Sequence, residues 1–505
     1  MKKILVVMII ATLCMGFLFS CAEETAPPPQ AQEDTGNGDN GGDDDGTAAV
    51  DPTVERITHN LPEGRYFDGY VFTVLSHRED SLDWYSPYPR EIIAEEEDGR
   101  PINDAVFRRN ATLRENYGFY FDLVAVPDSV GRLRMAIAAG EDRYGAIIIF
   151  NNHVSNAVQA GILIDVDHLT YVDRSMPWWC DGVEAMSIMN RNFLLASDML
   201  ILDNEATNAL IFNKVLMDNL GLPFPYDLVT SGRWTFDAME SMMRQATQDL
   251  DGDGVMTPEH DRWGFVTYND TLHALLVAGG GSFAEKDDND VPFMVFADER
   301  NLRIGDRAMD IMLSDDTMNI QRDVPSGGDG NPGWQRVMYD VFTEDRALFM
   351  WVRMRVIERF RGMESGFGIL PLPKFDEHQD NYRSIVNPWT GVLMGVPLSA
   401  TDLDRTSFIL EAAAAESRYT LQVAYYDIVL QRQFARDNES EAMLDLIFST
   451  RTYDIGAVYN FGGIFGEYIG LAANNNRNII SFYERMSRVL TREIERTIDR
   501  LMDLD

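Results

Sequence analysis

Hydrophobic positions along the chain follow two periodicities, one typical of strands and one typical of helices. Short apolar runs at residues 70–76, 119–126 and 145–150 predict three strands, the last of them buried. Between these runs, residues 101–118 and 129–140 carry apolar side chains at helical spacing, and each segment ends at a glycine. This order of strand, helix, strand, helix and strand predicts an α/β fold in which helices cover a parallel sheet.

Polar side chains directly follow the third predicted strand. Asn151 and Asn152 come after the run that ends at Phe150, and His153 follows them. Open α/β sheets bind ligands beyond the carboxyl ends of their strands, so Asn151 and Asn152 are candidate ligand-binding residues. Asparagine is also common in turns, and a purely structural role therefore stays open for both residues.

The first residues predict export from the cytoplasm. A basic start precedes an apolar stretch at residues 4–19, which is shorter than the roughly 20 residues of a membrane span and typical of a signal peptide. Residues 18–21 resemble a bacterial lipobox, in which Cys21 would be lipidated, although Phe19 is larger than the residue that lipoboxes prefer. Residues 1–21 are therefore expected to be a lipoprotein signal, and the lipid would anchor the protein to the extracytoplasmic face of the cell membrane. A plain secretory signal is the alternative.

The amino-acid composition predicts a linker and excludes one class of partner. Residues 22–60 are rich in proline, glycine and acidic residues, so they are predicted to be a disordered linker. The chain has 505 residues and a formal net charge of −38, which excludes nucleic acid as a partner and favours neutral or cationic partners. If Cys14 leaves with the signal and Cys21 carries lipid, only Cys180 remains, and no intramolecular disulfide can form.

Several segments after the linker resemble one protein family. Residues 208–254 contain a strand ending in Phe-Asn-Lys, a Gly-Leu-x-x-Pro turn and a Trp-Thr-x-Asp helix start. This order resembles the extracellular solute-binding proteins of bacterial carbohydrate ABC importers. "PINDAVFRRN" at residues 101–110 is similar to an early helix of that family, and "ALFMWVRM" at residues 347–354 to its segment at the interlobe cleft. Residues 367–384 and 387–400 resemble its return crossing.

The resemblance implies a periplasmic-binding-protein-like fold of type 2, with two α/β lobes and a ligand cleft between them. Residues 61–195 and 369–425 would form lobe 1, and residues 196–368 and 426–505 would form lobe 2. The implied function is to capture a small solute, most readily a carbohydrate, and to deliver it to the permease subunits of an ABC importer. Aromatic rings in such a cleft suit the C–H faces of sugars, while amides and carboxylates suit their hydroxyl groups.

Tryptophans in the segments that resemble the cleft walls are the aromatic candidates. Trp351 lies in "ALFMWVRM" and Trp389 in "NPWTGV", and for both residues ligand stacking and core packing stay open. Trp84 joins them, because it stands in a polar loop after the first predicted strand. Asn204 is a further polar candidate for ligand binding. Trp234, at a predicted helix start, is expected to pack in the core instead.

An acid-rich loop before Trp263 resembles a calcium loop. Acidic residues recur at its positions 1, 3 and 5, and a glycine stands at position 6. Position 12, where an EF-hand needs a bidentate glutamate, is His260. Two alternatives stay open, a structural calcium ion or a turn held by Asp side chains on backbone amides, and no cofactor is required for the expected function. The candidate metal ligands are Asp249, Asp251, Asp253, the carbonyl of Val255 and Thr257.

The sequence shows no motif of a catalytic site. It lacks Gly-x-Ser-x-Gly, His-Glu-x-x-His and a phosphate-binding loop. We therefore expect a binding protein and not an enzyme. Two alternatives remain: a surface lipoprotein that hydrolyses glycans with two of its 81 acidic residues, and a calcium-dependent surface binding module that relies on the Asp loop.

Overall fold

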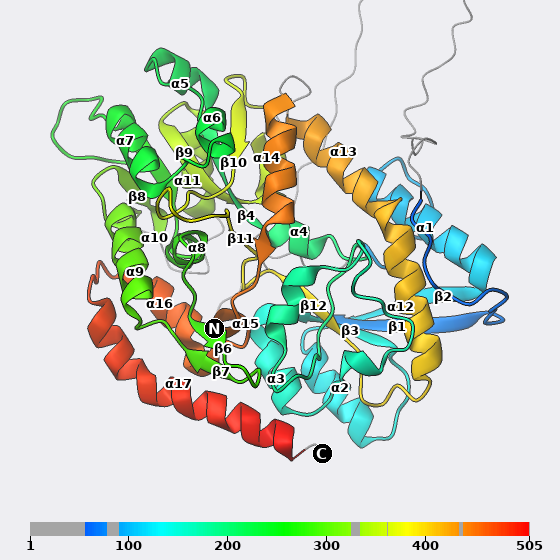
Figure 1. Cartoon of the computed structure of the whole chain (residues 1–505). Coiled ribbons are helices and arrows are strands. Elements are labelled where there is room, and N and C mark those ends of the chain that lie inside the picture. The colour runs from blue at the N-terminus through cyan, green and yellow to red at the C-terminus, as the bar shows by residue number, and fades with distance from the viewer. Residues whose placement is uncertain (1–55, 78–89, 325–333, 361, 434–437, 504–505) are drawn as a thin grey trace, which may run out of the picture. The chain divides into compact units, whose positions relative to one another are not determined.

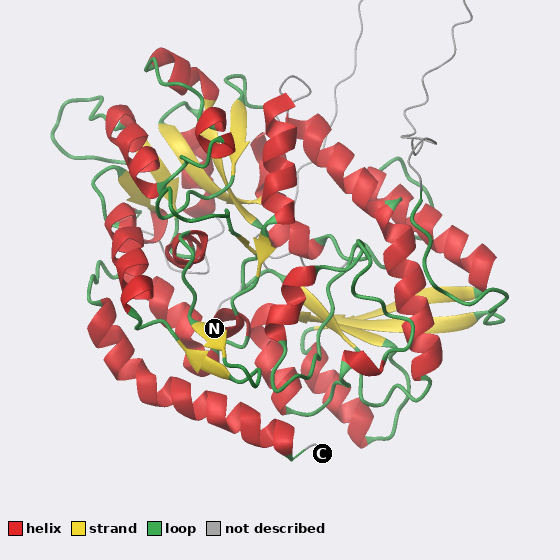
Figure 2. Ribbon diagram, viewed as in Figure 1, coloured by secondary structure: helices red, strands yellow, loops and turns green. Residues whose placement is uncertain are grey.

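Two mixed sheets flanked by helices carry the fold (Figure 1, Figure 2). The computed structural model describes residues 56–77, 90–324, 334–360, 362–433 and 438–503, all of which belong to the unit Val50–Asp505. The predicted signal with Cys21, most of the predicted linker and Trp84 lie outside the described residues. Within the described ranges, every helix is too short or too polar to cross a membrane.

The first sheet has the strand order β12-β3-β1-β2. Strand β1 (Tyr70–His77) is parallel to both β2 (Phe119–Val126) and β3 (Ala146–Phe150), which confirms the parallel arrangement predicted from the hydrophobic pattern. The fourth strand, β12 (Val392–Gly395), comes from far along the chain and pairs antiparallel with β3. The fourth strand of this sheet therefore lies outside the strand and helix pattern predicted for residues 70–150.

Two predicted helices connect the strands of this sheet. Helix α1 (Pro101–Tyr117) has a proline at its first position, where the missing N–H would be unpaired in any case. It ends at Gly118, whose φ of 70° suits a residue without a Cβ atom. Helix α2 (Ser129–Ala138) begins after Asp128, whose carboxylate accepts a 2.8 Å hydrogen bond from the N–H of Gly131. Local capping therefore fixes the end of α1 and the start of α2.

The second sheet has the strand order β10-β4-β9-β5-β8. Its strands are β4 (Asn208–Asn213), β5 (Trp263–Thr267), β8 (Thr317–Asn319), β9 (Ala347–Arg353) and β10 (Phe367–Leu370). β5 is parallel to β8 and β9, whereas β4 is antiparallel to β9 and β10. Every residue of these five strands is buried, as expected for a sheet that is covered on both faces.

Two chain crossings between the sheets lie side by side. Helix α4 (Leu202–Ala206) leads into β4 of the second sheet, and the segment that starts at Val386 leads into β12 of the first. Thr207 forms an antiparallel bridge with Val386, and the N–H of Asn387 donates a 3.0 Å hydrogen bond to the carbonyl of Ala206. The crossings are therefore joined by backbone hydrogen bonds. The lobe boundaries assigned from the sequence stay a prediction.

The remaining elements cover the sheets and close the chain. The long helix α17 (Ile479–Met502, red in Figure 1) packs against both α3 and α9. In sequence, α3 follows β3 of the first sheet, and α9 comes between β5 and β8 of the second sheet. The other helices are η1 (Asn151–His153), α3 (Val154–Gln159), η2 (Val166–His168), η3 (Asp181–Met186), α5 (Lys214–Asn219), α6 (Tyr226–Thr230), α7 (Phe236–Ala246), α8 (Thr271–Ala278), α9 (Glu299–Met312), α10 (Ile320–Asp323), α11 (Trp334–Thr343), η4 (Met354–Phe360), α12 (Leu403–Arg418), α13 (Leu421–Gln433), α14 (Asn438–Ser449), α15 (Ile455–Val458), η5 (Phe461–Gly463) and α16 (Ile464–Ala473). The short pairs are β6 (Ala284–Lys286) with β7 (Pro292–Met294), and β11 (Ser384–Ile385) with β13 (Arg451–Thr452).

Candidate functional site

The two asparagines that follow β3 lie against the second crossing. Asn151 is fully buried, and its backbone N–H donates a 3.0 Å hydrogen bond to the carbonyl of Gly391. A Cβ atom on Gly391 would lie 2.6 Å from Nδ2 of Asn151 and 2.6 Å from Cγ1 of Val386, so the close approach requires glycine. No described residue bonds to Oδ1 or Nδ2 of Asn151 or to Oδ1 of Asn152, although all three atoms are buried. Such atoms require partners, which a ligand or ordered water can supply.

Trp351 places an aromatic ring near the end of β9 in the second sheet. It is 1% exposed within β9, and its ring meets that of Tyr268 nearly at a right angle, with the ring centroids 4.5 Å apart. Its Nε1 atom is buried, and no described residue accepts a hydrogen bond from it. In this structure the ring is therefore packed on a neighbouring aromatic side chain, and its N–H remains available to a further acceptor.

A carboxylate and a guanidinium join these rings at the strand ends. Asp270 follows β5, and its Oδ2 accepts a 2.8 Å hydrogen bond from Nδ2 of Asn387 in the second crossing. Burial raises the pKa of Asp270, while the Asn387 hydrogen bond and the positive charge of Arg353 oppose that shift. Burial also raises the pKa of Tyr268, and the charge of Arg353 again opposes it. Arg353, at the end of β9, is thus close enough to act on both side chains.

Amide side chains extend this polar edge along the second sheet. Asn269 follows β5, and its Oδ1 accepts a 3.1 Å hydrogen bond from Nδ2 of Asn319 at the end of β8. The backbone N–H of Asn269 donates to Oε1 of Gln321 at 2.8 Å. The sequence interpretation did not select these residues or Asp270. The sequence feature that marked Asn151 was nevertheless present here as well, because each of these residues lies at or shortly after the end of a buried strand.

Trp389 lies in the second crossing, two residues from Gly391. Its backbone N–H donates a 3.0 Å hydrogen bond to Oδ1 of Asn387, the residue that also holds Asp270. The indole is half-buried, and its edge meets the ring of Phe465 with centroids 5.6 Å apart. A chain of contacts through the second crossing and the end of β5 thus links Asn151, Trp351 and Trp389. We call these residues, together with Asn152, Tyr268, Asp270, Arg353 and Asn387, the strand-end cluster.

Asn204 lies elsewhere, in the wall of a cavity of about 730 Å³. It is 3% exposed, its Nδ2 donates a 2.9 Å hydrogen bond to Oε1 of Gln422, and its Oδ1 accepts one from Arg451. These bonds use both ends of the amide to tie α4 to α13 and β13. Asn204 is therefore separate in its contacts from the strand-end cluster. The other residues lining this cavity include Trp179, Cys180, Asp198, Arg418 and Tyr426.

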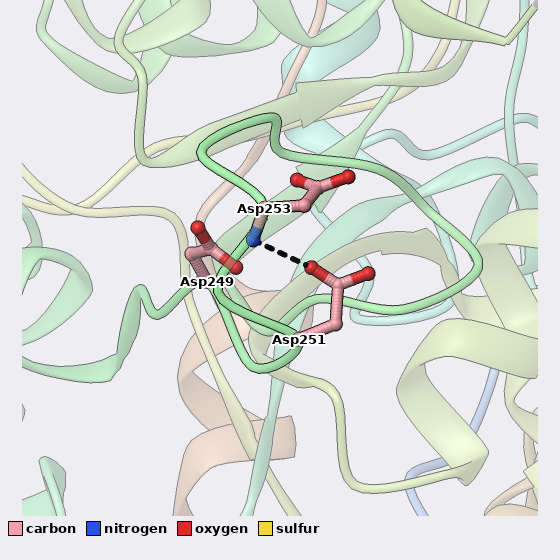
Figure 3. Close-up of side chains that lie close together, drawn as sticks. All are labelled: Asp249, Asp251 and Asp253. Atoms are coloured by element: carbon pink, nitrogen blue, oxygen red, sulfur yellow. Dashed lines mark hydrogen bonds between the residues drawn. The ribbon is translucent and has the colours of Figure 1, made fainter.

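The acid-rich loop forms a compact turn before β5 (Figure 3). One carboxylate oxygen from each of Asp249, Asp251 and Asp253 lies within 4.8 Å of the others, a spacing that can accommodate a calcium ion with oxygen ligands at about 2.4 Å. Backbone N–H groups already bond to these side chains, as in the donation from Gly252 to Oδ1 of Asp249 at 2.6 Å. Gly254 also donates, to Oδ2 of Asp249 at 2.8 Å. The turn held by Asp side chains is thus present, and calcium binding stays a prediction.

Asp261 closes the loop in place of a ligand at position 12. Its Oδ1 accepts a 2.9 Å hydrogen bond from the N–H of Leu250, and its Oδ2 accepts from both the N–H and the hydroxyl of Thr257, at 2.6 and 3.2 Å. The hydroxyl of Thr257 is therefore engaged, whereas the side chain of Val255 is 60% exposed. Trp263 is 5% exposed and donates from Nε1 to the carbonyl of Thr257 at 3.4 Å, so it anchors the loop.

The loop and the strand-end cluster lie at opposite ends of one strand. The loop directly precedes β5, whereas Tyr268 and Asp270 directly follow it. The strand itself separates the two by five residues of extended chain. An ion in the loop would therefore stabilise the second sheet from its far edge without touching the strand-end cluster.

Comparison with solved structures identifies the fold. A cyclic alpha-maltosyl-1,6-maltose binding protein from Arthrobacter globiformis is 12% identical, with a TM-score of 0.54 over 84% of this chain and 99% of that one. UspC from M. tuberculosis is 13% identical, with a TM-score of 0.54 over 83% and 99% of the two chains. RafE from Streptococcus pneumoniae is 13% identical, with a TM-score of 0.51 over 85% and 98%.

The chain has the two-lobed fold of the periplasmic binding proteins. This result confirms the fold class that the sequence resemblance implied. No protein-family model matches the chain, and no curated protein sequence matches it either. The likeness therefore resides in the backbone arrangement, which these proteins share at low sequence identity.

Proposed function

We propose that this protein is a lipid-anchored substrate-binding protein that captures a carbohydrate between its two sheets and delivers it to an ABC importer permease. One observation carries the proposal: Asn151, Asn152 and Trp351, which lie at or near strand ends of the two sheets, have buried polar atoms that no described residue satisfies. A cyclo/maltodextrin-binding protein complexed with maltotetraose shares the fold, at 12% identity and a TM-score of 0.51, and supports this choice of ligand class.

The chemistry of a sugar matches what the cluster offers. Each sugar hydroxyl can donate and accept a hydrogen bond, and can thus satisfy the amide of Asn151, Oδ1 of Asn152 and the indole N–H of Trp351 together. A buried polar atom without a partner costs about 1–3 kcal/mol, so a ligand that fails to reach these atoms binds more weakly. The half-buried ring of Trp389 offers an apolar surface for the C–H face of a sugar.

The proposed role is binding without chemical conversion. The test is isothermal titration calorimetry of the mature protein against mono- and oligosaccharides, combined with analysis of the recovered sugar. We expect saturable binding of one sugar per chain, recovery of the sugar unchanged, and stabilisation of about 2.7 kcal/mol at a free ligand concentration of 100 Kd. Release of cleaved sugar would identify a glycan hydrolase instead, and the absence of any bound saccharide would refute the proposal.

The residue that best tests the location of the site is Asn151. Asn151→Asp keeps the size of the side chain but replaces two donor hydrogens with a charge, so it should weaken saccharide binding at least tenfold. Asn204→Asp is the matched control, because both ends of its amide bond to the protein outside the strand-end cluster. It should lower the melting temperature and leave the affinity of the folded protein within about twofold. The opposite result would move the site to the cavity lined by Asn204.

A further inference from the structure

One arginine beside the strand-end cluster has no ion pair with the part of the chain that the structure describes. Arg355 lies in helix η4, which follows β9 directly, and its Nη1 atom is buried without a hydrogen-bond partner among the described residues. Burial lowers the pKa of Arg355, Glu205 opposes this shift, and the charges of Arg90, Arg353 and Arg359 add to it. Three other guanidinium groups thus act on Arg355, in a chain whose formal net charge is −38.

The nearby acidic residues do not neutralise this group. Glu205 is an acid whose charge acts on Arg355, but its Oε1 is already paired with Nη2 of Arg90. Oε2 of Glu205 is buried and has no partner among the described residues. Burial raises the pKa of Glu91, next to Arg90, to about 8, so that this carboxyl carries little charge at neutral pH. Among the charges that act on Arg355 in the described part of the chain, positive charge is therefore in excess.

The excess positive charge borders the proposed binding site. Trp351, Arg353 and Arg355 follow one another at alternate positions from β9 into η4. Arg353 acts electrostatically on Arg355 on one side and on Asp270 and Tyr268 on the other. The arginines are thus continuous with the tryptophan and the carboxylate that the strand-end cluster contains.

A guanidinium in such a place is stabilised when an anion reaches it. Withdrawing a charge from water without a counter-charge is costly, and the repulsion between like charges adds to that cost. Arginine forms two parallel N–H···O bonds with a carboxylate, which makes this pairing both strong and directional. Adjacent sugar hydroxyls can bond to Oε2 of Glu205, since a hydroxyl donates where a carboxylate only accepts.

We propose that the captured solute is an acidic saccharide, with a uronate carboxylate held by the guanidinium of Arg355. This inference rests on the proposed function and narrows its ligand class. It also departs from the overall composition, because a net charge of −38 favours neutral or cationic partners, whereas the local charge around Arg355 is positive. At contact distance the local charge determines the affinity for an anion, because salt screens surface charges that lie more than about 10 Å away.

Calorimetry with matched sugar pairs tests the assignment. The probes are glucuronate against glucose, galacturonate against galactose, and trigalacturonate against galactotriose, each titrated into the mature protein. We expect at least one uronate to bind tenfold or more tightly than its neutral counterpart, with an affinity that falls as salt rises. Preferential binding of the neutral members, or of sulfated sugars in place of the uronates, would overturn the assignment.

Variants of the arginine locate the carboxylate. Arg355→Gln should abolish the preference for the uronate while leaving the affinity for the neutral sugar within about threefold, and Arg355→Lys should retain part of the preference. Arg359→Gln is the charge-matched control on the same helix, since that guanidinium is exposed over the ring of Tyr339 at 5.5 Å. An equal loss in both glutamine variants would show that general charge, and not contact with Arg355, sets the preference.

The outcomes separate this inference from the function on which it rests. If neutral sugars bind and uronates do not, the carboxylate assignment fails and the saccharide-binding function stands. If neither class binds while thermal melting shows a folded protein, the proposed function itself fails. Melting curves of all three variants establish that a loss of affinity does not reflect unfolding.

Discussion

At the scale of single residues, two tryptophans of the site differ in burial. Trp351 is 1% exposed and packed on Tyr268, whereas Trp389 is half-buried. We expect Trp389→Ala to weaken saccharide binding about 10- to 150-fold, because a stacked ring contributes about 1.5–3 kcal/mol. Trp351→Ala should weaken binding similarly and also lower the free energy of unfolding by about 3–5 kcal/mol, since it empties a buried site. Calorimetry and thermal melting measure the two effects.

Trp234 provides the control for both tryptophan variants. It is fully buried, and its Nε1 donates a 3.0 Å hydrogen bond to the carbonyl of Pro371, which confirms the predicted packing role. Trp234→Ala should lower the melting temperature and leave the affinity of the folded fraction unchanged. If this variant alone lost affinity, the cluster around Trp351 and Trp389 would not be the binding site.

Gly391 carries a second prediction at this scale. Gly391→Ala would place a methyl group 2.6 Å from Nδ2 of Asn151 and from Cγ1 of Val386, which forces both side chains to move. We expect a loss of about 1–3 kcal/mol in the free energy of unfolding, together with weaker sugar binding, because Asn151 is displaced. Gly362→Ala is the control, since no heavy atom of the described residues, its chain neighbours apart, lies within 4 Å of a Cβ atom at that position. Denaturant unfolding compares the two variants, and equal stabilities would contradict the close approach.

A buried glutamate makes stability depend on pH. Glu411 is 1% exposed, and its Oε1 and Oε2 accept hydrogen bonds from the indole nitrogens of Trp178 and Trp179 at 2.9 and 2.8 Å. Burial raises the pKa of Glu411 to about 7, although the indoles oppose the shift and the nearby charge of Asp173 adds to it. The folded protein therefore holds a proton on this group at pH values where the unfolded chain has lost it.

The sign of the effect follows from that proton. Stability from Glu411 is greatest below its unfolded pKa of about 4.5 and is lost as the pH rises to about 7, by roughly 3 kcal/mol in total. Glu411→Gln removes this titration. Between pH 5 and pH 8 the wild type should therefore lose stability relative to the variant in denaturant unfolding. A constant difference between the two proteins would mean that the pKa of Glu411 is not raised.

At the scale of elements, the acid-rich loop can be tested apart from the binding site. Asp261→Asn should destabilise the protein with or without calcium, because Asp261 joins Leu250 and Thr257 across the loop. Removal of calcium by a chelator should leave sugar affinity unchanged, since the loop precedes β5 and the site follows it. Equilibrium dialysis at millimolar calcium measures the ion itself. If dialysis detects no bound calcium, the loop is not a calcium site. If chelation causes a large loss of sugar affinity, the loop belongs to the binding site.

The elements of the first sheet could be predicted because their signals are local. The runs around β1, β2 and β3 and the glycine that ends α1 each lie within a few residues of the feature they determine. Asn151 was likewise predictable, since it follows a strand directly. The partners of the site were not, because Asn387 and Asp270 are 117 residues apart in sequence, and only the crossing between sheets brings them to 2.8 Å.

The antiparallel strands show the same limit. Strand β12 pairs with β3 after a separation of more than 200 residues, and nothing in its four residues indicates which sheet receives it. Trp351 was selected through its resemblance to a cleft segment, but its contact with Tyr268 depends on the register between β5 and β9. Side-chain partners across a sheet depend on pairings that a single sequence does not record.

At the scale of the whole molecule, lipid anchoring is a separate prediction. Cys21→Ala should prevent lipidation and shift the exported protein from the membrane fraction to the soluble fraction, because the predicted linker offers nothing else that inserts into lipid. Cys180→Ala is the control, since it leaves Cys21 in place. Fractionation followed by immunoblotting measures the change. Retention of the Cys21→Ala variant in the membrane would show that the protein is held there by other means.

The paired crossings determine how the two sheets can move. A single crossing could twist and bend by itself. Here the Thr207–Val386 bridge and the Asn387–Ala206 hydrogen bond join the two crossings, so they must move together. We expect the sheets to rotate about these joined crossings, with a different angle between them in the sugar-bound and the empty protein. Two probes placed one on each sheet would therefore report a single coordinate, and capture would change one distance distribution without broadening it.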